Sequence, residues 1–179
     1  MDALPRRSGN GDRRLALGFV CSVCGELHAE RMLDIRLTLP DPIFSLDEDA
    51  RAARAWLADD FAVLDEERFF VRGLLELPIP ELETRFAYGT WVEVSSGEFG
   101  RLLEHWQDPD QFRAAEGRVA NELTPYVGTT GLSARLDPVS VDTLPAVTLA
   151  DADHPLVADQ RAGISAERSD ELAATVLHA

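Results

Sequence analysis

The sequence predicts an α+β fold, with a mostly antiparallel central sheet flanked by helices and an N-terminal zinc-ribbon-like knuckle. Two long extended segments follow each other in mid-chain, and helical periodicity occurs before, between and after the extended segments. No helix is placed to connect parallel strands more than once. The chain has 179 residues, of which 45% are hydrophobic, enough for one core. We expect a flexible leader over 1–14 and a single domain over 15–179.

The knuckle is expected to be a hairpin over 15–40. It carries the two cysteines of the sequence, Cys21 and Cys24, followed by Gly25 and His28. A glycine at this place permits the positive φ that turns backbone N–H groups toward the sulfur atoms. Extended segments are expected on either side of the turn, over 15–20 and 29–37.

Two helices are predicted by a serine followed three residues later by a glutamate, the pattern of a capping box. The first box begins at Ser45 and opens a helix over 46–58. The second begins at Ser95 and opens an amphipathic helix over 96–107, whose apolar residues recur at helical spacing.

The middle of the chain predicts an antiparallel hairpin. Segments 68–79 and 85–94 both alternate their side chains between two faces, and the proline-rich stretch between them reads as a loop. Both faces carry apolar residues, so both are expected to be at least partly covered. Three shorter strands are expected further along, over 119–123, 132–138 and 146–149.

The C-terminal part returns to helix. His154 stands before Pro155, an arrangement typical of a helix cap with proline in the first turn. Ser165 is expected to cap a last helix that carries Leu172 on its apolar face.

Charge excludes several classes of partner. The formal net charge is −15, and all 17 basic residues are arginines. Residues 1–20 carry +2 and the remainder −17, so the body repels phosphate backbones and anionic lipid surfaces. We therefore expect no nucleic-acid partner and no membrane partner. No run of apolar residues is long enough for a membrane span, and the N-terminus does not resemble a signal peptide. The expected location is the cytoplasm, where thiols stay reduced.

Four segments resemble a known family in their order and spacing: CSVCGELH, RFFVRGLLELP, FAYGTWVEVS and DHPLVADQRAGIS. Together they are similar to a family of small bacterial proteins, domain of unknown function 2199, over about residues 19–178. The resemblance implies a bacterial single-domain protein and carries no established activity, ligand or catalytic residue. The stretch 31–37 is longer and more charged here than the family's usual continuation.

The knuckle is the candidate metal site. Cys21, Cys24 and His28 supply three ligand types that zinc favours, and a structural site needs a fourth. The candidates for the fourth ligand are His105, His154, His178 or a carboxylate. Three ligands and a water would instead form a catalytic site. We favour a turn that keeps its shape without metal, so no cofactor is expected, with zinc as the alternative. A redox pair is disfavoured because the motif lies between strands and not at a helix N-terminus.

Four residues are candidate binding residues: Arg72, Trp91, His154 and Gln160. A guanidinium in an apolar strand must be paired, so Arg72 either holds a carboxylate or phosphate or forms an internal ion pair. We favour the ion pair.

Trp91 and Tyr88 either line a pocket or belong to the core, and the core is favoured. His154 either exchanges protons with a nearby carboxylate or caps its helix, and the cap is favoured. Gln160 follows on the same helix and could share a site with His154.

The sequence lacks the common nucleophile, phosphate-loop, zinc-protease and dinucleotide motifs. It favours a non-enzymatic protein-binding or regulatory module, whose acidic body steers toward a basic partner surface. The alternative is a metal-assisted hydrolase or another small-molecule enzyme that uses Cys21, Cys24 and His28. Oligomeric state is left open.

Overall fold

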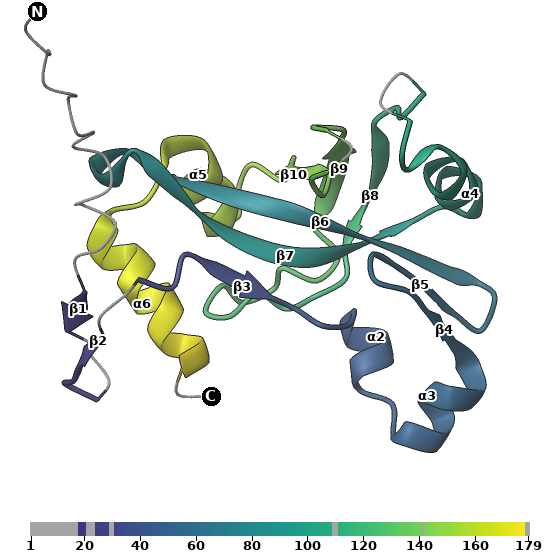
Figure 1. Cartoon of the computed structure of the whole chain (residues 1–179), viewed down its shortest axis with the longest axis horizontal. Coiled ribbons are helices and arrows are strands. Elements are labelled where there is room, and N and C mark those ends of the chain that lie inside the picture. The colour runs from purple at the N-terminus through teal and green to yellow at the C-terminus, as the bar shows by residue number, and fades with distance from the viewer. Residues whose placement is uncertain (1–17, 21–23, 29–30, 109–110, 141, 178–179) are drawn as a thin grey trace, which may run out of the picture.

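A long two-stranded hairpin organises the structure. The computed structural model describes residues 18–20, 24–28, 31–108, 111–140 and 142–177. Strand β6 (Arg68–Ile79) pairs antiparallel with β7 (Thr84–Val94) along the whole length of both. A short 3₁₀ turn, η1 (Pro80–Leu82), joins them. The predicted hairpin is present, and it forms the axis of the molecule in Figure 1.

Five strands close into a barrel. Three strands join β6 and β7 in the ring: β8 (Ala115–Val119), β9 (Ser133–Asp137) and β10 (Ala146–Leu149). Neighbours are antiparallel except at the seam, where β10 runs parallel to β6 and Ala146 pairs with Leu74. The expected open antiparallel sheet flanked by helices is therefore wrong. The fold is a closed five-stranded barrel with additional strands and few helices.

Glycine at the seam permits this closure. A Cβ at Gly73 would lie 2.6 Å from Val147 Cγ2 and 2.9 Å from the carbonyl oxygen of Pro145, so only glycine lets β10 approach β6 this closely. At Gly89 the nearest atom would lie 3.6 Å from a Cβ, an ordinary contact. Periodicity reports which face each strand buries. It does not report which strands meet, so closure was not visible in the sequence.

Additional strands extend the hairpin beyond the barrel. Strand β3 (Asp34–Arg36) runs parallel to β7, and β5 (Phe61–Leu64) pairs antiparallel with β6. Strand β4 (Ala55–Leu57) pairs with β5 and ends the sheet. Neither β4 nor β5 was predicted.

The expected helix over 46–58 is shorter and starts differently. Helix α2 (Asp41–Phe44) is followed by α3 (Glu48–Arg54). The N-cap of α3 is Asp47, whose carboxylate accepts from the Ala50 N–H at 2.8 Å, so the box expected at Ser45 is wrong. The helix ends at Arg54 because the next three residues pair with β5.

The remaining helices follow the predicted caps. Helix α4 (Ser96–His105) packs on β6, α5 (Pro155–Ala162) packs on β6 and β10, and α6 (Ala166–Leu177) contacts β3. Ser95 accepts from the Glu98 N–H, and Ser165 accepts from the Arg168 N–H at 3.0 Å. No helix within the described ranges has the length and apolar character needed to cross a bilayer.

The N-terminal hairpin lies apart from the main sheet. Strands β1 (Phe19–Val20) and β2 (Leu27–His28) pair antiparallel, and Gly25 between them has the expected positive φ of 72°. Cys21 and the leader 1–14 lie outside the described residues, and no zinc knuckle is shown. The strand expected over 29–37 is reduced to β3, which belongs to the main sheet.

Side chains of β6 and β7 alternate between two apolar cores. The inner core fills the barrel, with Val71, Leu75 and Val92 among its members. The outer core is smaller and is covered by α2, β4 and β5. Its buried members are Ile43, Ala62, Leu64, Phe70, Trp91 and Ala120.

Candidate functional site

Arg72 and Trp91 lie directly opposite each other on β6 and β7. At this point both strands change neighbours. Along β6 the partner changes from β5 to β10, and along β7 it changes from β3 to β8. The two residues therefore mark a junction at which ring strands and additional strands exchange places along the two edges of the hairpin.

Arg72 forms an internal ion pair, the alternative that we favoured. Its side chain is 9% exposed, and Nη2 donates to Asp60 Oδ1 at 2.5 Å. The guanidinium also lies 5.8 Å from the ring centre of Trp91, within the range of a cation–π interaction. The Nε atom is buried and has no hydrogen-bond partner among the described residues. A single carboxylate therefore leaves part of this guanidinium unused.

Trp91 and Tyr88 occupy core positions. Trp91 is buried in the outer core, and its Nε1 donates to the Leu37 carbonyl oxygen at 3.1 Å. Tyr88 faces the inner core and donates to the Thr124 carbonyl oxygen at 3.1 Å. Burial raises the pKa of the Tyr88 hydroxyl. Neither aromatic ring is free to hold a ligand by stacking.

Asn121 was not predicted as a key residue, although it joins four segments. It is buried, and its Oδ1 accepts from the Trp91 N–H at 2.9 Å and from the Thr90 hydroxyl at 3.2 Å. Its Nδ2 donates to the Leu39 carbonyl oxygen and to an Asp41 carboxylate oxygen. The side chain thus fills the gap in the β7 edge between β3 and β8.

His154 acts as a helix cap. Its Nδ1 accepts from the Leu156 N–H at 3.1 Å, and its Nε2 lies 3.1 Å from the Val127 carbonyl oxygen. Since Nδ1 is an acceptor, the second contact requires the proton on Nε2. Both ring nitrogens are engaged in structure.

Gln160 ties helix α5 to the barrel. Its Oε1 accepts from the Leu149 N–H at 2.9 Å, and its Nε2 donates to the Val147 carbonyl oxygen at 2.7 Å. Among the described residues, neither Gln160 nor His154 shares a hydrogen bond with Arg72. The structure does not unite the predicted binding residues in one site.

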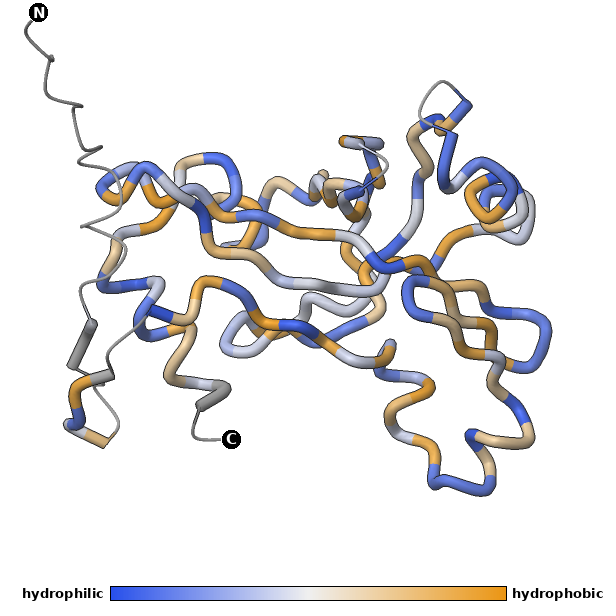
Figure 2. The backbone as a smooth tube through the Cα atoms, in the orientation of Figure 1, coloured by the Kyte–Doolittle hydropathy of each residue, from blue (hydrophilic) through white to orange (hydrophobic). Residues whose placement is uncertain are grey.

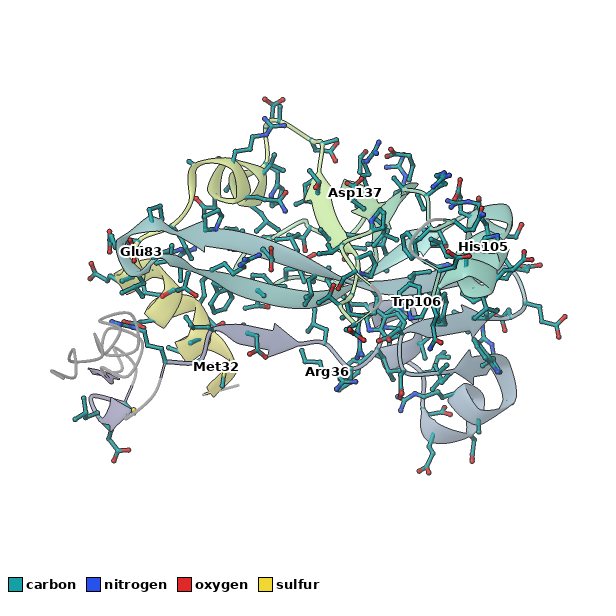
Figure 3. The ribbon with its side chains drawn as sticks, turned by 45° about the horizontal axis from the view of Figure 1, so that its top comes forward. Met32, Arg36, Glu83, His105, Trp106 and Asp137 are labelled. Atoms are coloured by element: carbon teal, nitrogen blue, oxygen red, sulfur yellow. The ribbon has the colours of Figure 1, made fainter. Side chains whose placement is uncertain are left out.

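The metal hypothesis stays a prediction. Cys24 is exposed, while Cys21 and the side chain of His28 lie outside the description. In the part of the chain that is described, no three metal-binding side chains gather. His105, one proposed fourth ligand, ends α4 at the opposite end of the molecule from the N-terminal hairpin (Figures 1 and 3). It is therefore not in reach of Cys24.

A groove of about 360 Å³ runs over the outer face of β6 and β7, in the part of the hairpin that β3 and β10 flank. Its lining residues come from β3, β6, β7 and the loop before β10: Asp34, Ile35, Arg36, Arg72, Leu74, Ala87, Gly89 and Leu144. Arg36 is exposed at the end of β3 (Figure 3). The groove therefore carries two guanidinium groups over an apolar floor.

A second, smaller hollow of about 140 Å³ lies at the end of the barrel beside α4. Trp106 and Phe112 form its aromatic wall, with ring centres 5.7 Å apart. The described residues that line it include no charged group.

The free edge of β4 exposes large apolar side chains. Trp56 is 51% exposed and Leu57 43%, and Phe44 on the neighbouring α2 is 65% exposed. Figure 2 shows hydrophobic colour along β4 and β5 between hydrophilic turns. Because successive side chains of a strand point to opposite faces, Trp56 and Leu57 flank the edge on both sides.

A family model matches the chain over residues 20–164, which is most of its length. The model describes an uncharacterized protein conserved in bacteria, DUF2199. This chain belongs to the DUF2199 family. The resemblance inferred from the four sequence segments is thereby confirmed. No curated protein and no solved structure matches this DUF2199 chain.

The groove, the junction and the β4 edge all lie within the residues that match DUF2199. Sequence reasoning identified Arg72 because a guanidinium interrupts an apolar strand. It missed Arg36, which lies in a strand of three residues and offers no such contrast. It also missed the exposed edge at Trp56, because the segment 46–58 was expected to be a helix and residues 55–57 form a strand.

Proposed function

We propose that this DUF2199 protein is a non-enzymatic protein-binding module of the cytoplasm, and that it captures an extended, basic segment of a partner protein along the free edge of β4. The observation that carries the proposal is a sheet edge whose two flanking side chains, Trp56 and Leu57, are large, apolar and exposed. Edge strands accept an additional strand through their unpaired backbone groups, and alternate side-chain pockets give specificity.

The backbone of β4 offers such groups. The Ala58 N–H donates to the carbonyl oxygen of Phe61, and the Asp65 N–H donates to the carbonyl oxygen of Arg54. Antiparallel pairing alternates, so the N–H and C=O of Leu57 point away from β5, toward the free edge. Three backbone groups face outward in this strand, the C=O of Ala55 and both groups of Leu57, since the Ala55 N–H closes helix α3.

Charge supports a basic partner. The segment 41–67, which builds α2, α3, β4 and β5, contains nine carboxylates and two arginines, a net charge of −7. One of those arginines, Arg54, is already paired with Asp65 at 2.6 Å. An acidic surface around an apolar edge raises the association rate of a cationic segment and rejects an acidic one.

The test uses a defined probe, a dye-labelled heptapeptide in which valine alternates with lysine. We expect saturable binding by fluorescence anisotropy, and amide shifts in the NMR spectrum centred on β4. A peptide in which glutamate replaces lysine serves as the charge control and should not bind. Absence of binding by the lysine peptide, or amide shifts confined to another surface, contradicts the proposal.

Leu57→Pro is the decisive variant. Proline removes only an N–H that faces outward, so the β4–β5 pairing is retained. We expect the peptide affinity to fall about tenfold while the thermal midpoint changes little. Light scattering on the wild type and on Leu57→Pro tests whether a second copy of the chain occupies the edge instead of a partner. A wild-type dimer that becomes monomeric in Leu57→Pro would show that the edge binds a second copy of the chain and not a partner.

A further inference from the structure

We propose that the groove on the outer face of β6 and β7 is a binding site for a monocarboxylate with a short apolar tail, held by Arg36 and Arg72. This site is separate from the β4 edge and does not depend on the function proposed above. The two arginines line the same groove from neighbouring rows of the sheet. Arg36 pairs in register with Gly89 of β7, and Gly89 pairs with Leu74 of β6. Arg72 lies two residues before Leu74, so its side chain points to the same face of the sheet.

Arg72 supplies a fixed guanidinium at the inner end of the groove. Asp60 sets its position through two hydrogen bonds. Arg72 Nη2 donates to the Asp60 carboxylate, and the Arg72 backbone N–H donates to the Asp60 carbonyl oxygen. Nη1 makes no hydrogen bond within the described residues, and Arg72 is one of the residues that line the groove. A donor pair on one guanidinium matches the two oxygens of a carboxylate. The groove therefore contains a pre-oriented donor whose ordering cost is already met by the fold.

Arg36 is an unusual arginine in this acidic protein. Most of the arginines that the structure describes form an ion pair with a carboxylate or donate to backbone carbonyls, whereas Arg36 does neither within the described ranges. It is exposed and can move toward a ligand in the groove. An unpaired guanidinium at the mouth and a fixed one at the inner end can together enclose one anionic group.

The rest of the lining selects the class of ligand. Leu74, Ala87 and Gly89 form a floor without polar side chains, which suits a short hydrocarbon chain. Ala87 and Gly89 leave space because their side chains are small or missing. Asp34 and Asp60 lie beside the arginines and repel a second negative charge, so a single carboxylate fits better than a phosphate dianion.

The test titrates the full chain with hexanoate, hexanol and inorganic phosphate, and follows the amide shifts of β3, β6 and β7. We expect hexanoate to bind in the groove, and hexanol and phosphate to bind at least about tenfold more weakly. A second arm uses an acetylated dipeptide that ends in leucine, with a free carboxylate or an amide. Preference for the free-acid dipeptide over hexanoate assigns the site to protein C-termini, and the reverse preference assigns it to small acids.

Arg36→Gln is the informative variant, because an exposed residue without an ion pair is not needed for folding. We expect it to weaken hexanoate binding about tenfold. Arg161→Gln is the matched control, since Arg161 is also exposed and has no ion pair in the described part of the chain. Gly89→Ala narrows the floor and should weaken binding with the fold intact, as the new Cβ makes only ordinary contacts. Equal binding of hexanoate and hexanol, no binding of hexanoate, or unchanged affinity in Arg36→Gln would overturn the proposal.

Discussion

The β6–β7 hairpin carries two sets of strands, the ring (β8, β9 and β10) and the extension (β5 and β4), and they end differently. In the ring, β8 joins the C-terminal part of β7 and β10 joins β6 beyond Arg72, so the sheet closes on itself and no strand edge is left. In the extension, β5 joins the N-terminal part of β6, and the sheet stops at β4, a strand of three residues. One pair of strands thus supplies both a closed core and an exposed edge, and the difference is made by which segments pair along their outer sides. We expect the ring to contribute more to the stability of the fold than the extension.

The largest expected effect compares two leucines. Leu75 is fully buried in the barrel, and Leu57 lies at the free edge. We expect Leu75→Ala to lower the free energy of unfolding by about 3–5 kcal/mol, because it leaves a cavity in a closed core. Leu57→Ala should cost less than about 1 kcal/mol. Urea denaturation measures both, and equal losses would show that the extension is as tightly packed as the barrel.

The next largest loss of stability is expected at the seam of the barrel, where β10 pairs with β6. We expect Gly73→Val to destabilise the protein by about 3 kcal/mol, because the added atoms overlap Val147 and the backbone of Pro145. Gly100→Ala on α4 is the control, since no atom lies within 4 Å of its Cβ position. There the substitution should stabilise by about 0.5–1 kcal/mol. Tolerance of valine at position 73 would mean that β10 does not approach β6 as closely as described.

The junction at Arg72 and Trp91 is expected to depend on Asn121. Asn121→Ala leaves the Trp91 N–H buried without an acceptor, and we expect a loss of about 2 kcal/mol. Amide hydrogen exchange should accelerate at β3 and in the outer core more than inside the barrel. Uniform acceleration across the molecule would contradict the distinction between the ring and the additional strands.

The smallest effect is a dependence on alkaline pH. Both tyrosines of the chain are buried, and burial raises the pKa of each hydroxyl. For Tyr126, a hydrogen bond that its hydroxyl donates to Asp159 raises the pKa further. The folded state then keeps protons that the unfolded state releases above about pH 10. Stability should be constant with respect to these groups below that pH and fall above it.

Urea titrations between neutral and alkaline pH measure this slope. The chain contains no lysine, so few other groups titrate in that range. Tyr126→Phe should reduce the slope, while Tyr88→Phe reports the contribution of the other hydroxyl. A slope that survives both substitutions would assign the alkaline sensitivity elsewhere.

Sequence reasoning was strongest where one local rule acted alone. The hairpin over 68–94 and the cap at Ser95 were predicted because alternation and capping are local properties. The segment 55–57 follows an alanine-rich helix with good helical propensity, and pairing with β5 overrides that propensity. Barrel closure could not be predicted, because it rests on a contact between Leu74 and Ala146 that no periodicity encodes.

The candidate site was predictable in part for the same reason. Arg72 stands out in an apolar strand, but its partner could not be chosen among 32 acidic residues. Asp60 becomes the partner because the β4–β5 turn brings it beside β6. Arg36 enters the groove only through the parallel pairing of β3 with β7, and that pairing depends on tertiary structure.

The parallel seam also bears on how the protein is made. A ribosome releases β6 well before β10, so the side of β6 that β10 will occupy is bare while the nascent chain grows. A premature stop ahead of Ala146 would leave that backbone permanently uncovered, next to the apolar lining meant for the barrel interior. Such fragments should associate with one another through this uncovered side of β6.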